Sequence, residues 1–499
     1  MATDRWSLLE SRRSFVLVLA TATLLHVALA VSTPVSGDEA YYWDCSRHLD
    51  WSYFDQPPLV IWTMVPFRAL FGECRLAVRA PAVIASLLIG VFMVPLVRRL
   101  GGGYRHAAVA YLVLHGTPLF FMGSFYCSTD IAMGAAYLAA TWAAVALAQG
   151  ESRAWWGFGI AVGLGFLAKF PAVLVVAALA PALVRGAAGR DLRTPTPYLA
   201  AAMSGALTLP VWLWGAKHEW ANITFQLAGR HDGGGLTLRY MGELLAGDLL
   251  LLTPFLAIAV AVAWWLSRRD RDVGWAVARV AAIAPLVFFG LVSLRTRVAP
   301  HWIAPGIMVT FVMLPLVAFK WRRGLQLAGV VVGVGLSLSA IAVVLAPESL
   351  LDVEWTYRGR PNRISTDALS DLMGNQEIAD RVAAARRPGQ LVTSQSYSEV
   401  HMIAFLSKGA VPTRLAHITG GTHGLASLYW HRPSELEGRN MLFVTDRDDV
   451  EGKLLRLFEE VEEHSPIDIV RSGRVVRTMR LFSCRNLLHA SPAFSRLHD

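Results

Sequence analysis

The chain has 499 residues, of which 54% are hydrophobic and only 17% are charged, and its formal net charge at pH 7 is +9. This composition, with a mean hydropathy of +0.43, excludes an ordinary soluble globular protein and favours a polytopic membrane protein. In such proteins the excess of Lys and Arg lies mainly in cytoplasmic loops. The positive charge is therefore no evidence for DNA or RNA, and we expect no nucleic-acid partner.

Apolar runs that approach the roughly 20 residues needed to cross a bilayer occur along most of the first 346 residues. The eleven expected spans are 14–33, 76–97, 106–123, 129–149, 155–169, 171–185, 197–215, 247–266, 275–293, 302–319 and 324–346. The runs 155–169 and 171–185 are short and meet next to Pro171, so they are also compatible with one kinked element. If the N-terminus is cytoplasmic, every cluster of basic residues falls on the cytoplasmic side, which is the asymmetry that membrane insertion favours.

The composition becomes mixed after Leu345, which predicts two parts. Residues 1–346 form a transmembrane domain with a first extracytoplasmic loop at 34–75, and residues 347–499 form a small α/β domain outside the cytoplasm. In the loop, 57–71 is apolar but too short to span and predicts an interfacial helix. In the tail, the periodicity predicts helices at 367–387, 397–407 and 449–459 and strands at 390–396, 411–416, 440–445, 467–470 and 475–484.

Acidic side chains crowd into the first loop between long apolar runs. They are Asp38, Glu39, Asp44, Asp50 and Asp55. Carboxylates at the edge of a membrane need a partner or a function. Ser36 and Glu39 also fit a helix capping box, S-x-x-E, which explains both residues without any catalytic role. The capping box does not explain Asp38, which is a candidate general base for activating a hydroxyl group.

Two more acids and several basic residues extend this candidate site. Asp55, just before Pro57-Pro58, fits either the start of a helix or a metal or substrate ligand, and Asp130 fits either the positive end of a helix or a third acid of the site. Basic side chains at the same membrane face are Arg79, Lys169, Arg230, His231, Arg239, Arg295, Arg297 and His301. Each alone could reach lipid headgroups. Together they favour a pocket for the phosphate of a membrane lipid.

Four segments carry a likeness to a known family: G-D-E-A-Y-Y-W at 37–43, S-Y-F-D-Q-P-P-L at 52–59, Asp130, and G-F-L-A-K-F-P at 165–171. They resemble the lipid-linked sugar transferases of the glycosyltransferase C superfamily, which includes protein O-mannosyltransferases, aminoarabinose transferases of lipid A and lipopolysaccharide core glycosyltransferases. The resemblance implies a multi-pass enzyme of the bacterial inner membrane. It would move a hexosyl or pentosyl group, with inversion, from a polyprenyl-phosphate donor to a periplasmic glycolipid, glycan or protein.

The resemblance also implies roles for individual residues. Asp38 would be the catalytic base, Glu39 its neighbour and Asp130 the second acid. Lys169 would lie near the donor phosphate, where the residue types also favour Arg79, Arg295, Arg297 and His301. Asp55 and His231 would hold a divalent cation such as Mg, Mn or Zn. Gln56 departs from the family, because relatives have lysine or histidine at this place.

Three other functions are compatible with parts of the sequence. A transporter or flippase of lipid-linked sugars predicts charges near the membrane midplane and two related halves, whereas the acids here gather at one surface. A membrane anchor for the tail would place the chemistry after residue 350, whereas the enzyme hypothesis places it in about the first 300 residues. A ligase that uses a diphosphate-linked oligosaccharide is the nearest enzymatic alternative. Cys45 and Cys74 would share an oxidising compartment and either pair there or remain free.

Overall fold

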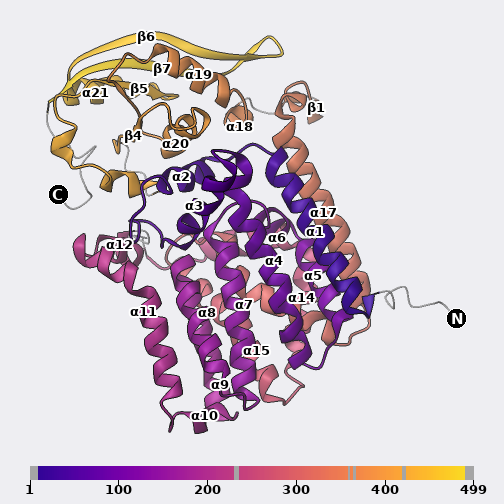
Figure 1. Ribbon diagram of the computed structural model, residues 1–499. Coiled ribbons are helices and arrows are strands. Elements are labelled where there is room, and N and C mark those ends of the chain that lie inside the picture. The colour runs from indigo at the N-terminus through magenta and orange to yellow at the C-terminus, as the bar shows by residue number, and fades with distance from the viewer. Residues whose placement is uncertain (1–8, 230–234, 358–359, 364–366, 419–422, 489–499) are drawn as a thin grey trace.

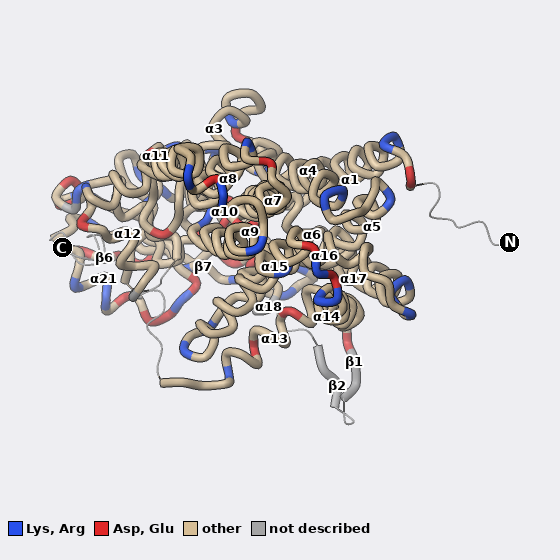
Figure 2. Tube along the Cα trace, turned by 90° about the horizontal axis from the view of Figure 1, so that it is seen from below, with Lys and Arg blue, Asp and Glu red and all other residues tan. Residues whose placement is uncertain are grey.

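The computed structural model describes residues 9–229, 235–357, 360–363, 367–418 and 423–488. A bundle of helices contains the first two thirds of the chain, and a small sheet lies across one end of it (Figure 1). Helix α2 (Gly37–Cys45) and helix α3 (Leu59–Phe71) lie between the bundle and the sheet. Figure 2 shows the opposite end of the bundle, where Lys and Arg mark many of the helix ends.

Six described helices are long and apolar enough to cross a membrane. They are α1 (Arg12–Ser32), α4 (Arg75–Arg99), α7 (Thr129–Ala148), α11 (Thr196–Lys217), α15 (Val273–Val292) and α17 (Arg322–Leu345). Helices α13 (Arg239–Leu252) and α14 (Pro254–Ser267) are together apolar enough for a further span, but they are bent by 103° around Thr253 and form either a broken span or a re-entrant loop. Thr253 has a φ of +64°, and Pro254 begins the next helix. The composition therefore predicts a multi-pass membrane protein correctly.

The remaining predicted spans are helical but short or interrupted. They comprise α5 (Tyr104–His115) with α6 (Pro118–Gly123), α8 (Ala154–Ala168), the 3-10 helix η2 (Phe170–Ala178) with α9 (Leu179–Val184), and η4 (Pro300–Ile303) with α16 (Ala304–Met313) and η5 (Leu314–Leu316). Short connecting helices are α10 (Ala188–Asp191), α12 (Ala221–Thr224) and the π-helix η3 (Phe225–Gly229). A count of eleven full spans is not confirmed for the described residues, because proline begins α6, α14 and η4 and thereby divides the apolar runs.

Helix α7 forms the centre of the bundle. Its sequence is rich in alanine, and it packs against α4, α8 and α15. Small side chains let neighbouring helices approach closely inside a membrane, where packing rather than the hydrophobic effect holds helices together. The first turn of α7 carries Asp130, so the tight packing of the bundle fixes the position of this acid.

The tail contains a mixed five-stranded sheet with the order β4-β3-β5-β7-β6. Strands β3 (Leu391–Ser394), β4 (Thr413–Leu415) and β5 (Met441–Thr445) are parallel, and β6 (Phe458–Arg471) and β7 (Arg474–Leu487) form a long antiparallel hairpin. The helices beside it are η6 (Pro347–Leu350), α18 (Asp367–Ser370), α19 (Asn375–Ala385), α20 (Tyr397–Leu406), η7 (Leu425–Tyr429), η8 (Pro433–Glu435) and α21 (Glu451–Leu457). A separate hairpin joins β1 (Glu354–Tyr357) to β2 (Arg360–Arg363).

The first loop is ordered by local capping and by the tail above it. The predicted capping box at the start of α2 is present, since the Ser36 side chain accepts from the Glu39 amide and the Glu39 carboxylate accepts from the Ser36 amide. Helix α20 packs on α2 (Figure 1). Cys45 and Cys74 are both free thiols, so no disulfide bond crosslinks this loop.

Candidate active site

A cavity of about 890 Å³ lies where the bundle, the first loop and the tail meet. Asp38, Asp55 and Asp130 all line it, although they come from three separate segments. Burial raises the pKa of the neighbouring Tyr42, and the negative charges of these three acids raise it further. The three acids therefore lie close enough together for their charges to act on the same side chain, and they share one cavity, as the sequence analysis expects.

Asp38 lies at the second residue of α2, and hydroxyl groups from two other elements hold its carboxylate. The Tyr397 hydroxyl, at the first residue of α20, donates to Oδ1 at 2.7 Å, and the Tyr126 hydroxyl, in the loop before α7, donates to Oδ2 at 3.2 Å. Burial raises the pKa of both phenols, and the charge of Asp38 raises it further. Both tyrosines therefore stay protonated and remain donors near neutral pH.

Asp130 and Lys169 form an ion pair that also lines the cavity. Lys169 Nζ lies 2.6 Å from Asp130 Oδ1, and His301 Nε2 lies 3.8 Å from Asp130 Oδ2. Lys169 is the extended residue between α8 and η2, where Pro171 prevents the helix from continuing. The helix break thus directs a cationic side chain to the acid, and the structure brings the candidate residues Asp130, Lys169 and His301 together.

The carboxylate of Asp55 is held by the protein itself. Its Oδ1 accepts from the Tyr41 hydroxyl at 2.6 Å, and its Oδ2 accepts from the backbone amides of Gly424 and Leu425 at 3.0 and 3.3 Å. Among the residues that the structure describes, no group of three or more His, Cys, Asp or Glu side chains could hold a metal ion. His231 lies outside the described residues. The described surroundings of Asp55 therefore do not fit the metal site expected from the resemblance.

Glu39 and Arg79 form a buried ion pair away from the cavity. Arg79 donates to both carboxylate oxygens of Glu39 at 2.7 Å and to the backbone carbonyl groups of Ala30, Thr33 and Pro34. Glu39 is 0% exposed and Arg79 is 2% exposed. Neither residue lines the cavity. The structure therefore does not bring Arg79, which is expected to contact a donor phosphate, into the cavity, and its guanidinium group is already surrounded by acceptors.

Arg295 and Arg297 also lie outside the lining of the cavity. Both side chains are exposed, and Arg297 pairs with Glu243 at 3.1 Å. Of the basic residues expected to hold a donor phosphate, Lys169 and His301 line the cavity, whereas Arg79, Arg295 and Arg297 do not. The charge pattern of the sequence places all of these residues at one membrane face but cannot show which of them turn inward.

Gln56 lines the same cavity and is 8% exposed. Its side-chain Nε2 has no hydrogen-bond partner among the described residues. A buried amide donor without a partner is costly, so a polar ligand in this cavity would satisfy it. Sequence reasoning noted Gln56 only as a departure from the family.

Other cavity residues give no signal in the sequence. Tyr41, Tyr126, Gln226, Tyr397 and His423 all line it. Tyr41 belongs to the motif at 37–43, but nothing in the sequence marks its hydroxyl as a partner of Asp55. Tyr397 and His423 belong to the tail, which the enzyme hypothesis places outside the chemistry.

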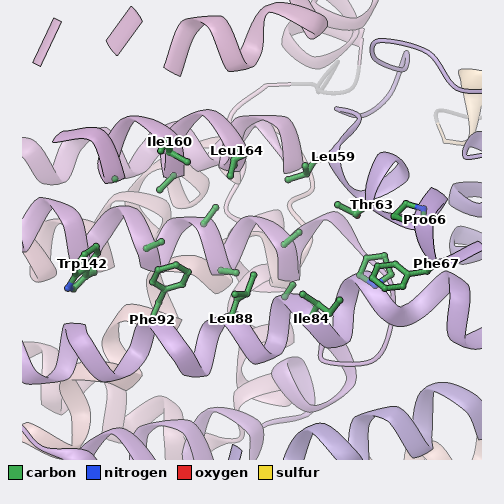
Figure 3. Close-up of a pocket in the computed structure, with 18 residues that line it drawn as sticks. Leu59, Thr63, Pro66, Phe67, Ile84, Leu88, Phe92, Trp142, Ile160 and Leu164 are labelled. Atoms are coloured by element: carbon green, nitrogen blue, oxygen red, sulfur yellow. The ribbon is translucent and has the colours of Figure 1, made fainter. Parts of the chain in front are cut away.

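A second hollow of about 510 Å³ runs along the other face of α7 (Figure 3). Its walls are α3, α4, α7 and α8, and the side chains that line it are almost all apolar. Leu59 and Phe67 lie at one end and Trp142 lies at the other (Figure 3). Leu59 lies three residues after Gln56 in the chain, so the first loop contributes side chains to both hollows.

Residues 55–214 match the protein family described as dolichyl-phosphate-mannose-protein mannosyltransferase. The lipid A galacturonosyltransferase RgtD of Rhizobium johnstonii is 26% identical over 456 residues, which are 87% of this chain and 91% of that protein. The undecaprenyl phosphate-alpha-4-amino-4-deoxy-L-arabinose arabinosyl transferase of Edwardsiella ictaluri is 26% identical over 364 residues, which are 65% and 62% of the two chains.

The fold has a solved counterpart. The crystal structure of ArnT from Cupriavidus metallidurans bound to undecaprenyl phosphate superposes with a TM-score of 0.65 at 17% identity, over 97% of this chain and 100% of that one. Together with the family match, the bundle and its acidic cavity define a membrane-embedded glycosyltransferase. The family match, the relatives and this shared fold confirm the resemblance of the first-loop motifs to lipid-linked sugar transferases.

Proposed function

We propose that this protein transfers a sugar from a polyprenyl-phosphate donor to an acceptor hydroxyl or amine on a periplasmic glycolipid of the lipid A type. The observation that carries the proposal is the Asp38 carboxylate, held by two phenols inside a cavity that also contains the Lys169–Asp130 pair. The relatives named above act on lipid A or use an undecaprenyl-phosphate sugar, which favours this acceptor over a protein or another glycan.

In the proposed reaction, Asp38 removes the proton from the acceptor group as that group attacks the anomeric carbon. The new bond forms on the face opposite the bond between that carbon and the phosphate oxygen, so the configuration inverts. The phosphate leaves with the bonding electrons. Lys169 and His301 stabilise the negative charge that develops there, because cations fixed in advance near a leaving group lower the barrier.

The lining of the cavity suits an amphipathic donor. Asp38, Lys169 and His301 supply polar groups, whereas other residues of the bundle supply an apolar lining. The apolar residues include Leu119, Phe120, Ile131, Val173, Leu174, Phe288 and Met308. A phosphate beside Lys169 and His301 would leave the prenyl chain to the side chains that require no hydrogen bonds. No step of this mechanism uses a divalent cation, because the partners of Asp55 do not fit one.

The protein is an inner membrane protein, and we propose that its N-terminus is cytoplasmic and that the cavity and the tail face the periplasm. The distribution of charge supports this orientation. Figure 2 shows Lys and Arg at many helix ends on the side of the bundle opposite the tail. The segments that the sequence analysis assigns to the cytoplasmic side carry Arg98, Arg99, Arg105, Arg153, Arg185, Arg190, Arg193, Arg268, Arg269, Arg271, Lys320, Arg322 and Arg323. Basic residues near short loops are retained on the cytoplasmic side during insertion.

The first prediction tests the proposed role of Asp38 as the general base. In a strain that lacks the gene, mass spectrometry of the envelope glycolipids should show the loss of one sugar substituent, and the wild-type gene should restore it. Asp38→Asn should fail to restore it, with transfer reduced at least about 100-fold, because an amide cannot accept the proton. The matched control is Asp448→Asn, which alters a fully exposed carboxylate of the tail.

Two results would count against the proposal. Full restoration by Asp38→Asn would remove Asp38 as the base. Release of the carrier as a diphosphate rather than a monophosphate would favour the ligase alternative, because the proposed bond cleavage leaves a single phosphate on the prenyl chain.

A further inference from the structure

The tail reaches the acids of the first loop by direct hydrogen bonds. Tyr397 donates to Asp38, although the two residues are 359 positions apart. The backbone amides of Gly424 and Leu425 donate to Asp55, and the amide of Ala426 donates to the Tyr41 hydroxyl at 3.2 Å. The tail therefore supplies partners to both acids that the first loop contributes to the cavity.

Close packing between α2 and α20 fixes these contacts. A Cβ atom at Gly37 would lie 1.9 Å from Ser398 Oγ and 3.1 Å from its Cα, so only glycine admits the first turn of α20 at this distance. Farther along, the ring of Trp43 meets the ring of Phe405 edge to face, at 5.3 Å between centroids. Tyr397 is thus held by a packed helix and not by a free loop.

We propose that the C-terminal domain forms a wall of the reaction site and that Tyr397 is a positioning residue for Asp38. The inference deepens the proposed function and rests on it. The Asp38 side chain has two rotatable bonds, and one hydroxyl donor on each carboxylate oxygen restricts both of them. Each oxygen retains a second lone pair, so the carboxylate is oriented and still able to accept a proton.

Tyr126 and Tyr397 belong to different parts of the protein. Tyr126 also lies 3.1 Å from Ser36 Oγ and belongs to the bundle, whereas Tyr397 comes from the tail. Burial raises the pKa of Tyr397, and the Asp38 charge raises it further, so its hydroxyl donates throughout the neutral range. His423 and Gly424 line the cavity beside it. The assignment differs from the expectation that the chemistry resides in the first 300 residues alone.

The second prediction tests this role in the full-length protein. Tyr397→Phe removes one oxygen and keeps the ring. The assay follows sugar transfer in the total lipid extract of the deletion strain, which contains both the unused donor and the unmodified acceptor. We expect kcat to fall about 10- to 100-fold. The KM for the donor should stay within about twofold, because Tyr397 contacts the base and not the residues proposed to hold the phosphate.

Two control variants distinguish a positioning role of the Tyr397 hydroxyl from an effect of the substitution on folding. Tyr198→Phe removes a phenol hydroxyl that bonds to the Leu192 carbonyl at the far end of the bundle, and Ser398→Ala removes the hydroxyl next to Tyr397 in the chain. Both variants should keep wild-type kcat. The thermal midpoint of Tyr397→Phe in detergent should match that of the wild type, since a phenylalanine ring fills the same space.

Unchanged kcat for Tyr397→Phe would overturn the inference, and so would a loss of activity that only follows a loss of folded protein. Asp38→Asn is measured in the same assay. If Asp38→Asn is inactive while Tyr397→Phe is fully active, the proposed function stands and only the role of the tail fails. If Asp38→Asn is active, the proposed base itself is wrong.

Discussion

At the scale of single residues, the ion pair between Glu39 and Arg79 shows that a residue of a family motif can be structural. Glu39 accepts from Arg79, from the Ser36 amide and from the Cys127 amide, while Arg79 reaches carbonyl groups at the end of α1. The pair therefore ties α1, α2, α4 and the loop before α7 together. Because this loop carries Tyr126, the pair supports the site without contacting it.

The third prediction follows from this burial. Arg79→Met keeps most of the length of the side chain but leaves the Glu39 carboxylate buried without its cation, which should cost about 3–5 kcal/mol of stability. Thermal unfolding in detergent measures the loss. Arg295→Met, at an exposed arginine, should have little effect. A stable Arg79→Met with a raised KM for the donor would instead support the phosphate contact that the sequence suggested.

At the scale of elements, the breaks in the apolar runs coincide with the cavity. Residues at or next to the breaks line it, among them Pro118, Phe170, Pro171, Leu251, Ala299 and His301. Irregular backbone at membrane depth is tolerated where it is enclosed by protein or lines a cavity, because there its polar groups find partners. The interruptions that reduce the number of full spans are therefore also the features that hold Lys169 and His301 in place.

This explains what the sequence could and could not predict about the elements. Hydropathy identifies the apolar runs, and the periodicity of the tail locates α19, α20, α21 and the strands β3, β4, β5 and β7, because both signals are local. The prediction misses the β1–β2 hairpin and residues 458–466 of β6. A hydropathy average over about 20 residues does not resolve a break inside the window. It therefore cannot show the turn at Thr253 or the 3-10 helix η2. Their prolines are visible, but a proline alone does not distinguish a kink from a new helix.

The fourth prediction concerns the contact between two elements, α2 and α20. Gly37→Ala introduces a methyl group that meets Ser398, including its backbone, so the two helices must separate. Overpacking of this kind typically costs about 1–3 kcal/mol, and separation would lengthen the bond between Tyr397 and Asp38. We expect a lower thermal midpoint and reduced transfer.

The matched control is Gly452→Ala in α21, where an added Cβ meets nothing within 4 Å and alanine suits a helix better than glycine. Gly452→Ala should keep both stability and activity. A Gly37→Ala protein that is as stable and as active as this control would show that the close approach of α20 is not required.

At the scale of the whole molecule, the site depends on contacts that no local pattern contains. The first-loop motifs indicate Asp38 and Asp55, the start of α7 indicates Asp130, and the helix break indicates Lys169, since each has a signal within a few residues. The partners of two of these acids come from residues 397 and 424–425, and nothing in the tail sequence points to the first loop. Sequence reasoning therefore finds the charged groups of the site and misses the groups that orient them.

The fifth prediction addresses how the tail is fixed to the bundle. Asp44 in α2 and His401 in α20 are 1% and 0% exposed, and His401 Nδ1 lies 2.9 Å from Asp44 Oδ2. Burial alone would raise the pKa of Asp44, but the hydrogen bond and charge of His401, with His48 and Arg47, outweigh it, so the pKa lies below the ordinary 3.8. A carboxyl whose pKa is lowered by folding stabilises the protein above its ordinary pKa, and this contribution is lost as the pH falls through the lowered value.

His401→Phe keeps a ring against Tyr41 and Trp430 but leaves the Asp44 oxygen without its partner in the tail. We expect a loss of about 3 kcal/mol at neutral pH and a smaller further loss below about pH 4 than the wild type shows, because the interaction that lowers the Asp44 pKa is gone. Thermal unfolding between pH 3 and 7 measures both effects, and His464→Phe, on the remote strand β6, is the control.

If the tail is part of the site, His401→Phe should also lose transfer activity at temperatures where it remains folded, since a loosened α20 carries Tyr397 away from Asp38. A variant that unfolds and titrates like the wild type would mean that this pair does not hold the two domains together.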